Sequence, residues 1–163
     1  REIVKTLLRN LIIAIIIAFF LILLTPIIKI LITKIFTPTD ETEVLINTYV
    51  NVRIFSVPAE LIIYILVGFY LGIQKTKISS LLLIIFSSLN IIFSSLLVLS
   101  LNLNVLGVAL GTLMASYITV VIFIFYTNNF IVNKFKVIPR FERLINKSKL
   151  TKLFKINFNI FIR

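Results

Sequence analysis

The sequence contains neither cysteine nor histidine. Without cysteine the chain can form no disulfide and no thiolate metal site. Without histidine it lacks the commonest general base and the commonest metal ligand. It also shows no nucleophile with a base beside it and no glycine-rich phosphate loop. We therefore expect that the protein is not an enzyme, that it does not use ATP itself, and that it needs no metal or cofactor.

Charged residues are scarce as well, at 14 % of the 163 residues, whereas hydrophobic residues make up 60 % and the mean hydropathy is +1.12. A water-soluble core could not hide so much apolar surface. Most of it lies in four stretches of 20 to 26 residues: 7–32, 49–71, 78–101 and 106–125. About 20 helical residues cross a hydrocarbon core of about 30 Å, and backbone groups inside a bilayer must pair internally. The sequence predicts an all-α, polytopic membrane protein with four transmembrane helices bundled within residues 1–127.

Acidic residues are few, since six Asp or Glu stand against 17 Lys or Arg and leave a net charge of +11. Eight basic residues and one acid, Glu142, fall within 128–158, so this segment carries +7 of that charge. Basic residues beside membrane helices mark the cytoplasmic side and can hold anionic lipid. This placement favours a lipid bilayer over nucleic acid as the partner. It also predicts that 128–163 is a basic cytoplasmic segment leading to a further helix.

The connections between the stretches alternate in charge. Basic residues precede the first stretch and separate the second from the third, whereas acidic residues separate the first from the second: Arg1, Lys5 and Arg9; Lys75 and Lys77; Asp40, Glu41 and Glu43. By the positive-inside rule, both termini are therefore expected in the cytoplasm. Lys29, Lys34 and Arg53 fall near the outer face, where their stems can snorkel to the lipid headgroups.

Glycine is rare, and the four glycines form two pairs at four-residue spacing: Gly68 with Gly72, and Gly107 with Gly111. Ala115 continues the second pair at the same spacing. Small residues in this pattern let the backbones of two membrane helices approach closely. We predict that both glycine pairs are helix-packing sites.

Proline is equally rare, and two of the four prolines lie within apolar stretches. Pro26 stands near the outer end of the first stretch, and Pro58 about one third of the way along the second. Proline removes a backbone donor and bends a helix, which membrane helices tolerate. Both prolines are interpreted as packing kinks, with flexing points of a transporter as the alternative.

Polar side chains mark one face of the third apolar stretch. Ser87, Asn90 and Ser94 follow one another at helical spacing, and Ser80 stands two turns earlier. One interpretation is a hydrogen bond between helices, worth about 0.6 kcal/mol. The other is a polar wall that lines a substrate or cation pathway. In either case we predict that Asn90 and Ser94 face the interior of the bundle.

Glu60 is the only carboxylate inside an apolar stretch, about one third of the way in from the outer end of the second. A carboxylate at this depth is expensive and is by default a functional candidate. The alternative is an ion pair with Arg53, which lies seven residues, or two helical turns, earlier. Both interpretations of Glu60 stay open on the sequence alone.

Four segments together carry a resemblance to a known family. Residues 49–59 (YVNVRIFSVPA) and 68–76 (GFYLGIQKT) resemble the beginning and end of the fourth helix of the multidrug and toxic compound extrusion (MATE) family, closest to its DNA-damage-inducible F-like branch. Residues 90–94 (NIIFS) resemble the N-I-x-L-D of its fifth helix, and 104–112 (NVLGVALGT) resemble the G-V-x-G-A-A-x-A-T that opens its sixth. Their order and spacing extend the resemblance over about half of the chain.

The resemblance implies a fragment of a twelve-helix transporter with two six-helix lobes. The four stretches would be helices three to six of the N-lobe, and 157–163 resembles the start of the seventh. The first two helices and the other lobe would be missing partners. Asn90 matches the Asn of the family's cation site, whereas Ser94 stands where an Asp is expected.

The family exports organic cations and drugs in exchange for Na⁺ or H⁺, so the resemblance implies a cation-coupled antiporter in a bacterial inner membrane. Ser94 puts coupling through this site in doubt, because a hydroxyl supplies neither the charge nor the titratable proton of a carboxylate. Two alternatives remain. One is a lipid or polysaccharide flippase of the same superfamily. The other is a non-transporting truncated remnant or a membrane interaction protein.

Overall fold

The computed structural model describes residues 2–135 of the chain. Its elements are α1 (Glu2–Leu23), α2 (Thr25–Phe36), α3 (Asp40–Arg53), the 3₁₀ turn η1 (Ile54–Ser56), α4 (Val57–Gly72), α5 (Thr76–Leu99) and α6 (Asn104–Phe135). Within the described range, four helical segments are long and apolar enough to cross a membrane: Glu2–Leu23, Asp40–Gly72, Thr76–Leu99 and Asn104–Asn133. The predicted class, an all-α polytopic membrane protein with four spanning helices, is confirmed.

The first apolar stretch is not one helix over 7–32 as predicted, because the chain breaks at Leu24 between α1 and α2. Pro26 has no N–H, so it cannot bond the carbonyl of Ile22 one turn earlier. The Thr25 hydroxyl replaces that donor, with its Oγ1 2.6 Å from the Ile22 oxygen. The proline then stands in the first turn of α2, where its missing donor does no harm. The expected kink lies at a one-residue interruption, since the N–H of Leu24 still bonds the carbonyl of Phe20 and the N–H of Ile28 bonds the carbonyl of Leu24.

The second stretch begins earlier than predicted, at the acidic first turn of α3, and it too is interrupted by a proline. Pro58 cannot donate to the carbonyl of Ile54, which accepts instead from the nearer N–H of Val57. This shorter hydrogen bond makes one turn of 3₁₀ helix at η1. The neighbouring carbonyl of Phe55 accepts a hydrogen bond of 3.1 Å from the Tyr117 hydroxyl of α6.

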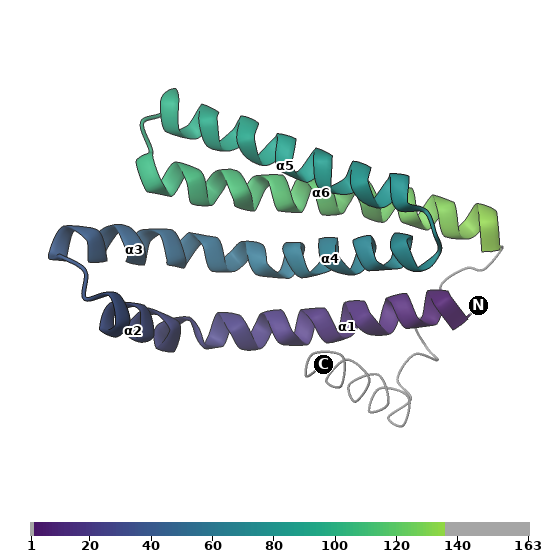
Figure 1. Ribbon diagram of the computed structural model, residues 1–163, viewed down its shortest axis with the longest axis horizontal. Coiled ribbons are helices and arrows are strands. Elements are labelled where there is room, and N and C mark those ends of the chain that lie inside the picture. The colour runs from purple at the N-terminus through teal and green to yellow at the C-terminus, as the bar shows by residue number, and fades with distance from the viewer. Residues whose placement is uncertain (1, 136–163) are drawn as a thin grey trace.

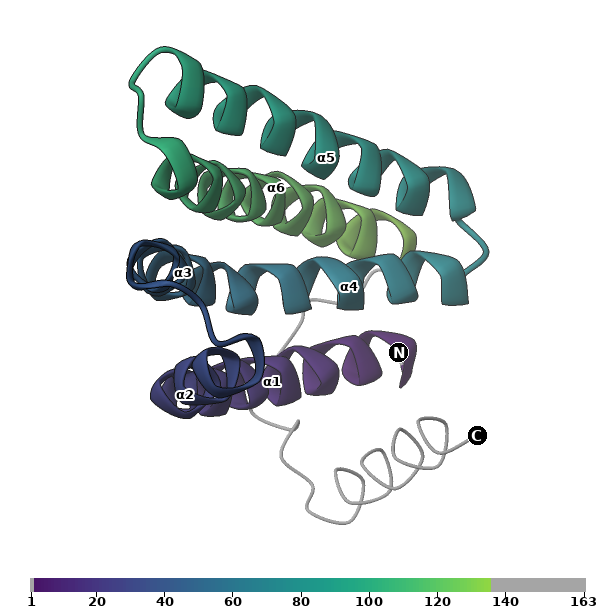
Figure 2. The ribbon, with the colours of Figure 1, turned by 60° about the vertical axis from the view of Figure 1, so that its left-hand side comes forward.

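The helices lie roughly side by side in a row (Figures 1 and 2). The line of α3 and α4 stands between α1 with α2 on one side and α6 on the other, and α5 covers the far side of α6. Contacts follow this order, since α1 touches α4, both α3 and α4 touch α6, and α5 touches α6 and α4. The last helix, α6, runs to Phe135, well past the predicted end at 125. The predicted basic segment 128–163 otherwise lies outside the described residues.

The buried apolar core draws on α1, α4, α5 and α6. It comprises Val4, Leu7, Ala59, Ile63, Leu66, Phe69, Tyr70, Leu82, Val120, Phe123 and Ile131. Tyr70 is fully buried, and its hydroxyl lies 2.7 Å from the Thr127 hydroxyl on α6. The Phe69 and Phe130 rings meet the Tyr70 ring edge-on at centroid separations of 5.2 and 6.0 Å. Most of this core therefore lies toward the end of the bundle where α4 turns into α5.

Only one of the two predicted glycine pairs packs against a helix. A Cβ on Gly111 would lie 2.5 Å from the backbone nitrogen of Ser94, and one on Gly107 would lie 3.1 Å from the backbone carbon of Leu97. Such contacts require hydrogen in place of a side chain, which confirms this pair as the seam between α6 and α5. Gly68 and Gly72 differ, because a Cβ on either would meet nothing within 4 Å among the described residues.

Candidate polar site in the membrane span

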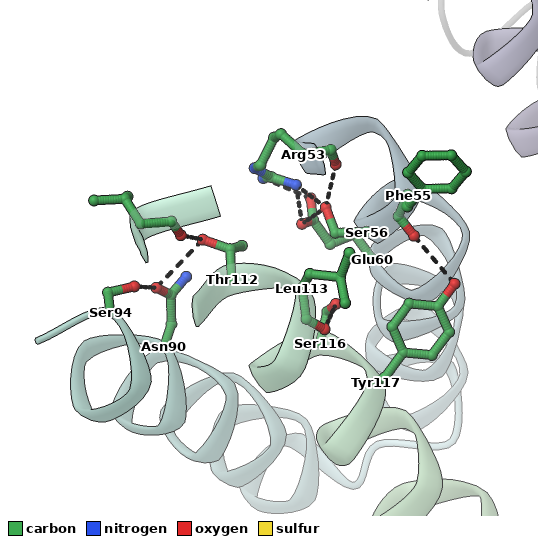
Figure 3. Close-up of polar contacts among 11 residues, drawn as sticks. Arg53, Phe55, Ser56, Glu60, Asn90, Ser94, Thr112, Leu113, Ser116 and Tyr117 are labelled. Carbon is green, nitrogen blue, oxygen red and sulfur yellow. Dashed lines mark hydrogen bonds and ion pairs between the residues drawn. The ribbon is translucent and has the colours of Figure 1, made fainter. Parts of the chain in front are cut away.

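Two polar clusters lie inside the apolar spans, one at the junction of α3 with α4 and one between α5 and α6 (Figure 3). The junction cluster consists of Arg53, Ser56 and Glu60. The second cluster consists of Asn90, Ser94 and Thr112. Each contains a residue that the sequence singled out, Glu60 in one and Asn90 in the other. The polar candidates thus fall into two separate networks.

In the junction cluster, the two terminal nitrogens of the Arg53 guanidinium bind the two oxygens of the Glu60 carboxylate. Its Nη1 contacts Glu60 Oε1 and Ser56 Oγ, and its Nη2 donates to Glu60 Oε2 at 3.0 Å. Ser56 is fully buried, its Oγ donates to the Arg53 carbonyl at 2.7 Å, and it lies 3.0 Å from Glu60 Oε1. The ion-pair interpretation of Glu60 is therefore the one that the structure bears out.

This pairing lowers the free-energy cost of placing two charges in an apolar span. A bidentate guanidinium–carboxylate contact is among the stronger charge-assisted hydrogen bonds, and the pair as a whole is neutral. The side chains of Arg53 and Glu60 are 28 % and 16 % exposed, so the pair reaches the surface of the bundle. While the pair is closed, both carboxylate oxygens are occupied by Arg53, and a second cation must displace it to bind there.

In the second cluster, Asn90 Oδ1 accepts a hydrogen bond of 3.0 Å from Ser94 Oγ on the same helix. Thr112 of α6 lies on the other side of that oxygen at 3.5 Å, the outer limit of a hydrogen bond. The Thr112 hydroxyl has a single proton. It donates that proton mainly to the carbonyl of Val108 on the same helix, which lies 3.0 Å away. Asn90 and Ser94 are both partly buried beside α6, which agrees with the prediction that they face the interior.

Ser87 does not belong to this cluster. It is exposed, as are Ser80 and Ser95, whereas Ser79 is buried. The structure therefore does not join Ser87 to the Asn90–Ser94 pair, and its place in a substrate or cation pathway stays a prediction.

A groove between α1 and α4 is a feature that sequence reasoning missed. It has a volume of about 790 Å³, and Gly68, Gly72 and Asn10 are among its lining residues. Asn10 Oδ1 is buried and has no hydrogen-bond partner among the described residues. The glycine pair that was expected to pack is thus the floor of an open groove. The sequence signal was present, but it could not say whether a helix covers the glycines.

Among residues 2–135, no group of three or more His, Cys, Asp or Glu side chains gathers into a possible metal site. Comparison of the chain with protein-family models, with curated proteins and with solved structures finds no match.

Proposed function

We propose that this chain is part of a secondary active transporter, equivalent to the middle of the N-lobe of a MATE-type cation-coupled multidrug antiporter in a bacterial inner membrane. The observation that carries the proposal is the Asn90–Ser94–Thr112 cluster. It places side-chain oxygens inside an apolar bundle, at the positions that resemble the family's N-I-x-L-D. Polar residues at such depth are costly to maintain and mark solute or ion pathways.

The mechanism that follows is alternating access, in which two lobes rock about a site near the middle of the membrane. In this chain the apolar core around Tyr70 lies toward one end of the bundle, and the ion-pair junction lies near the middle of the Asp40–Gly72 span. Asn90 supplies an amide oxygen to the pathway, and Ser94 supplies a neutral hydroxyl in place of a carboxylate. Glu60 is a carboxylate within the Asp40–Gly72 span, and it can take part in the pathway only when Arg53 releases it.

The chain by itself supplies only part of one wall. A transporter needs two halves that open alternately, and repeats normally provide them. We therefore expect that the chain alone does not carry out coupled transport and that it requires the first two helices and the partner lobe. Large apolar side chains are exposed along the whole bundle, such as Phe20 and Ile91 at 58 % and 68 %. These faces suit contact with lipid or with the missing helices.

The test is an efflux assay in liposomes with an imposed Na⁺ or proton gradient and a fluorescent organic cation. The chain alone should give no gradient-dependent dye movement above empty liposomes, because no closed pathway exists. Joined to segments that encode the missing helices, it should move the dye. Asn90→Ala should lower that rate, whereas Ser100→Ala, a polar-to-apolar change at an exposed position just after α5, should leave it unchanged.

Two results would contradict the proposal. Dye movement by the chain alone would mean that four helices suffice, and it would remove the need for a partner lobe. No movement by the completed assembly with either gradient would favour a flippase or a non-transporting membrane interaction protein.

A further inference from the structure

The junction between α3 and α4 is a mechanical weak point within a membrane-spanning segment. The α-helical hydrogen-bond pattern is interrupted over Ile54–Ser56, because Pro58 offers no N–H to the carbonyl of Ile54. Interruptions of this kind concentrate bending at a few residues. The Phe55 carbonyl at the break is held from outside by the Tyr117 hydroxyl at 3.1 Å. The break therefore depends on side chains for part of its stability.

The two helices on either side of the break are anchored very differently. Five residues of α4 are buried, including Ile63, Leu66 and Tyr70, whereas α3 contains no buried residue. α3 does contact α2 and α6, and one link to α2 is the contact between Lys29 and Asn51. It can therefore move with less loss of packing than α4.

Toward α3 the surface of α6 carries small side chains, whereas the larger Val120 and Phe123 belong to the buried core. Thr127 marks that side, because it bonds Tyr70 of α4. Ser116 and Ala109 lie three and five helical turns before Thr127, which places them on the same side of the helix, and both are fully buried. Small side chains there offer no ridge that would lock α3 in one position.

The Arg53–Glu60 pair spans this junction. Arg53 is the last residue of α3 and Glu60 lies in the first turn of α4, with η1 between them. The guanidinium also contacts the Ser56 hydroxyl, so one side chain ties α3, η1 and α4 together. Pivoting α3 about the break changes the separation of the two ends of this pair and must stretch its hydrogen bonds.

We propose that the Arg53–Glu60 pair is a latch: closed, it fixes the direction of α3 relative to α4, and open, it lets α3 pivot about Ile54–Ser56. The two bidentate hydrogen bonds and the Ser56 contact hold the closed state. Loss of the charge on Glu60 weakens the pair and releases α3, while the core that holds α4 remains intact. The latch concerns the conformation of this chain and does not rest on the proposed transport function.

Distance measurements between spin labels test this directly, because the chain has no native cysteine to remove. One label pair, at Thr42 on α3 and Leu99 on α5, reports on the pivot. A reference pair, at Tyr64 on α4 and Ser88 on α5, reports on the fixed part, and all four positions are exposed. Glu60→Gln should broaden or shift the Thr42–Leu99 distance distribution and leave the Tyr64–Ser88 distribution as in the native chain.

Two controls make the result specific. Glu41→Gln removes an exposed acid of α3 and should change neither distribution. Exchanging the charges, with Arg53→Glu and Glu60→Arg together, should rebuild the pair and restore the native Thr42–Leu99 distribution. An unchanged Thr42–Leu99 distribution in Glu60→Gln would overturn the latch. Equal broadening of both label pairs would also overturn it, since this would indicate general loosening and not a pivot.

Discussion

At the scale of single residues, Gly111 controls how closely α5 and α6 approach. Its hydrogen faces the backbone of Ser94, and a methyl group there would lie 2.5 Å from the Ser94 nitrogen. Rotating the Ser94 side chain cannot relieve that contact, because the Ser94 backbone nitrogen and Cα lie within 2.5 and 2.7 Å of the added carbon. The same approach brings Thr112 of α6 beside Asn90 of α5. The Asn90–Ser94–Thr112 cluster therefore depends on the absence of a side chain at Gly111.

Replacing Gly111 with Ala should destabilise the bundle, because the two backbones must separate to admit the methyl group. Overpacking of this kind costs about 1–3 kcal/mol. Gly68→Ala is the matched control, since a Cβ there meets nothing within 4 Å and should be nearly neutral. Unfolding of both variants by SDS in mixed micelles, followed by circular dichroism, gives the comparison. Equal stability of the two variants would mean that α5 and α6 do not touch at Gly111.

The Arg53–Glu60 ion pair shows, also at the scale of residues, that the energetic cost of a charge depends on whether a partner lies within reach. Arg53 and Glu60 are two helical turns apart, so their side chains reach each other across the break. A carboxylate without that partner would be an unpaired charge in an apolar span, which is far more costly than a neutral pair. The sequence alone offered this pairing as one of two interpretations, and the structure selects it.

At the scale of elements, two of the apolar stretches are each divided by a proline. The chain deals with the missing donor differently at the two places. Before α2 the hydroxyl of Thr25 bonds the orphaned carbonyl of Ile22, and at η1 the backbone tightens to a 3₁₀ turn. The backbone polar groups remain paired in both cases, as an apolar environment requires.

The first of these repairs predicts a non-additive pair of mutations. Thr25→Val leaves the Ile22 carbonyl without its 2.6 Å donor and should lower stability by about 1 kcal/mol. In the Pro26→Ala background an N–H at position 26 can bond that carbonyl, so Thr25→Val should then be nearly neutral. SDS unfolding of the two single variants and the double variant measures the coupling. Additive effects of the two changes would show that the hydroxyl does not replace the missing donor.

At the scale of the whole molecule, the charged residues and the apolar lengths predict the orientation. Basic residues gather at one end of the spans and acidic residues at the other, so both termini are expected in the cytoplasm. Thr39 lies just before α3 and Thr76 begins α5, and both residues are exposed. The two positions lie at opposite ends of the Asp40–Gly72 span and so belong to opposite sides of the membrane.

Cysteine labelling in intact cells tests this orientation, because the chain contains no other cysteine. Thr39→Cys should react with a membrane-impermeant maleimide added from outside. Thr76→Cys should react only after the cells are permeabilised, which also shows that the protein is present. The reverse pattern of labelling would show that the termini lie outside the cytoplasm and that the basic residues do not determine the topology.

The all-α class, the four spans and a small-residue seam at Gly107 and Gly111 could all be predicted from the sequence. These follow from the length of apolar runs and from the requirement that every backbone group in lipid be paired. The positions of Pro26 and Pro58 were also known from the sequence, but not how strongly each proline would disturb its helix. How the carbonyl freed by each proline is satisfied, by the Thr25 hydroxyl at Pro26 and by a 3₁₀ turn at Pro58, could be known only from the structure.

Which helix faces are covered could be learned only from the packing of the helices. It buried Gly111 and left Gly68 open, and it turned Asn90 toward α6 while leaving Ser87 exposed. The physical reason is that lipid tails are as apolar as leucine, so a membrane helix does not mark its packed face with hydrophobic residues. In a soluble helix the apolar stripe points to the core. In this chain leucine and isoleucine occupy both faces, and the neighbouring helix alone determines which one is buried.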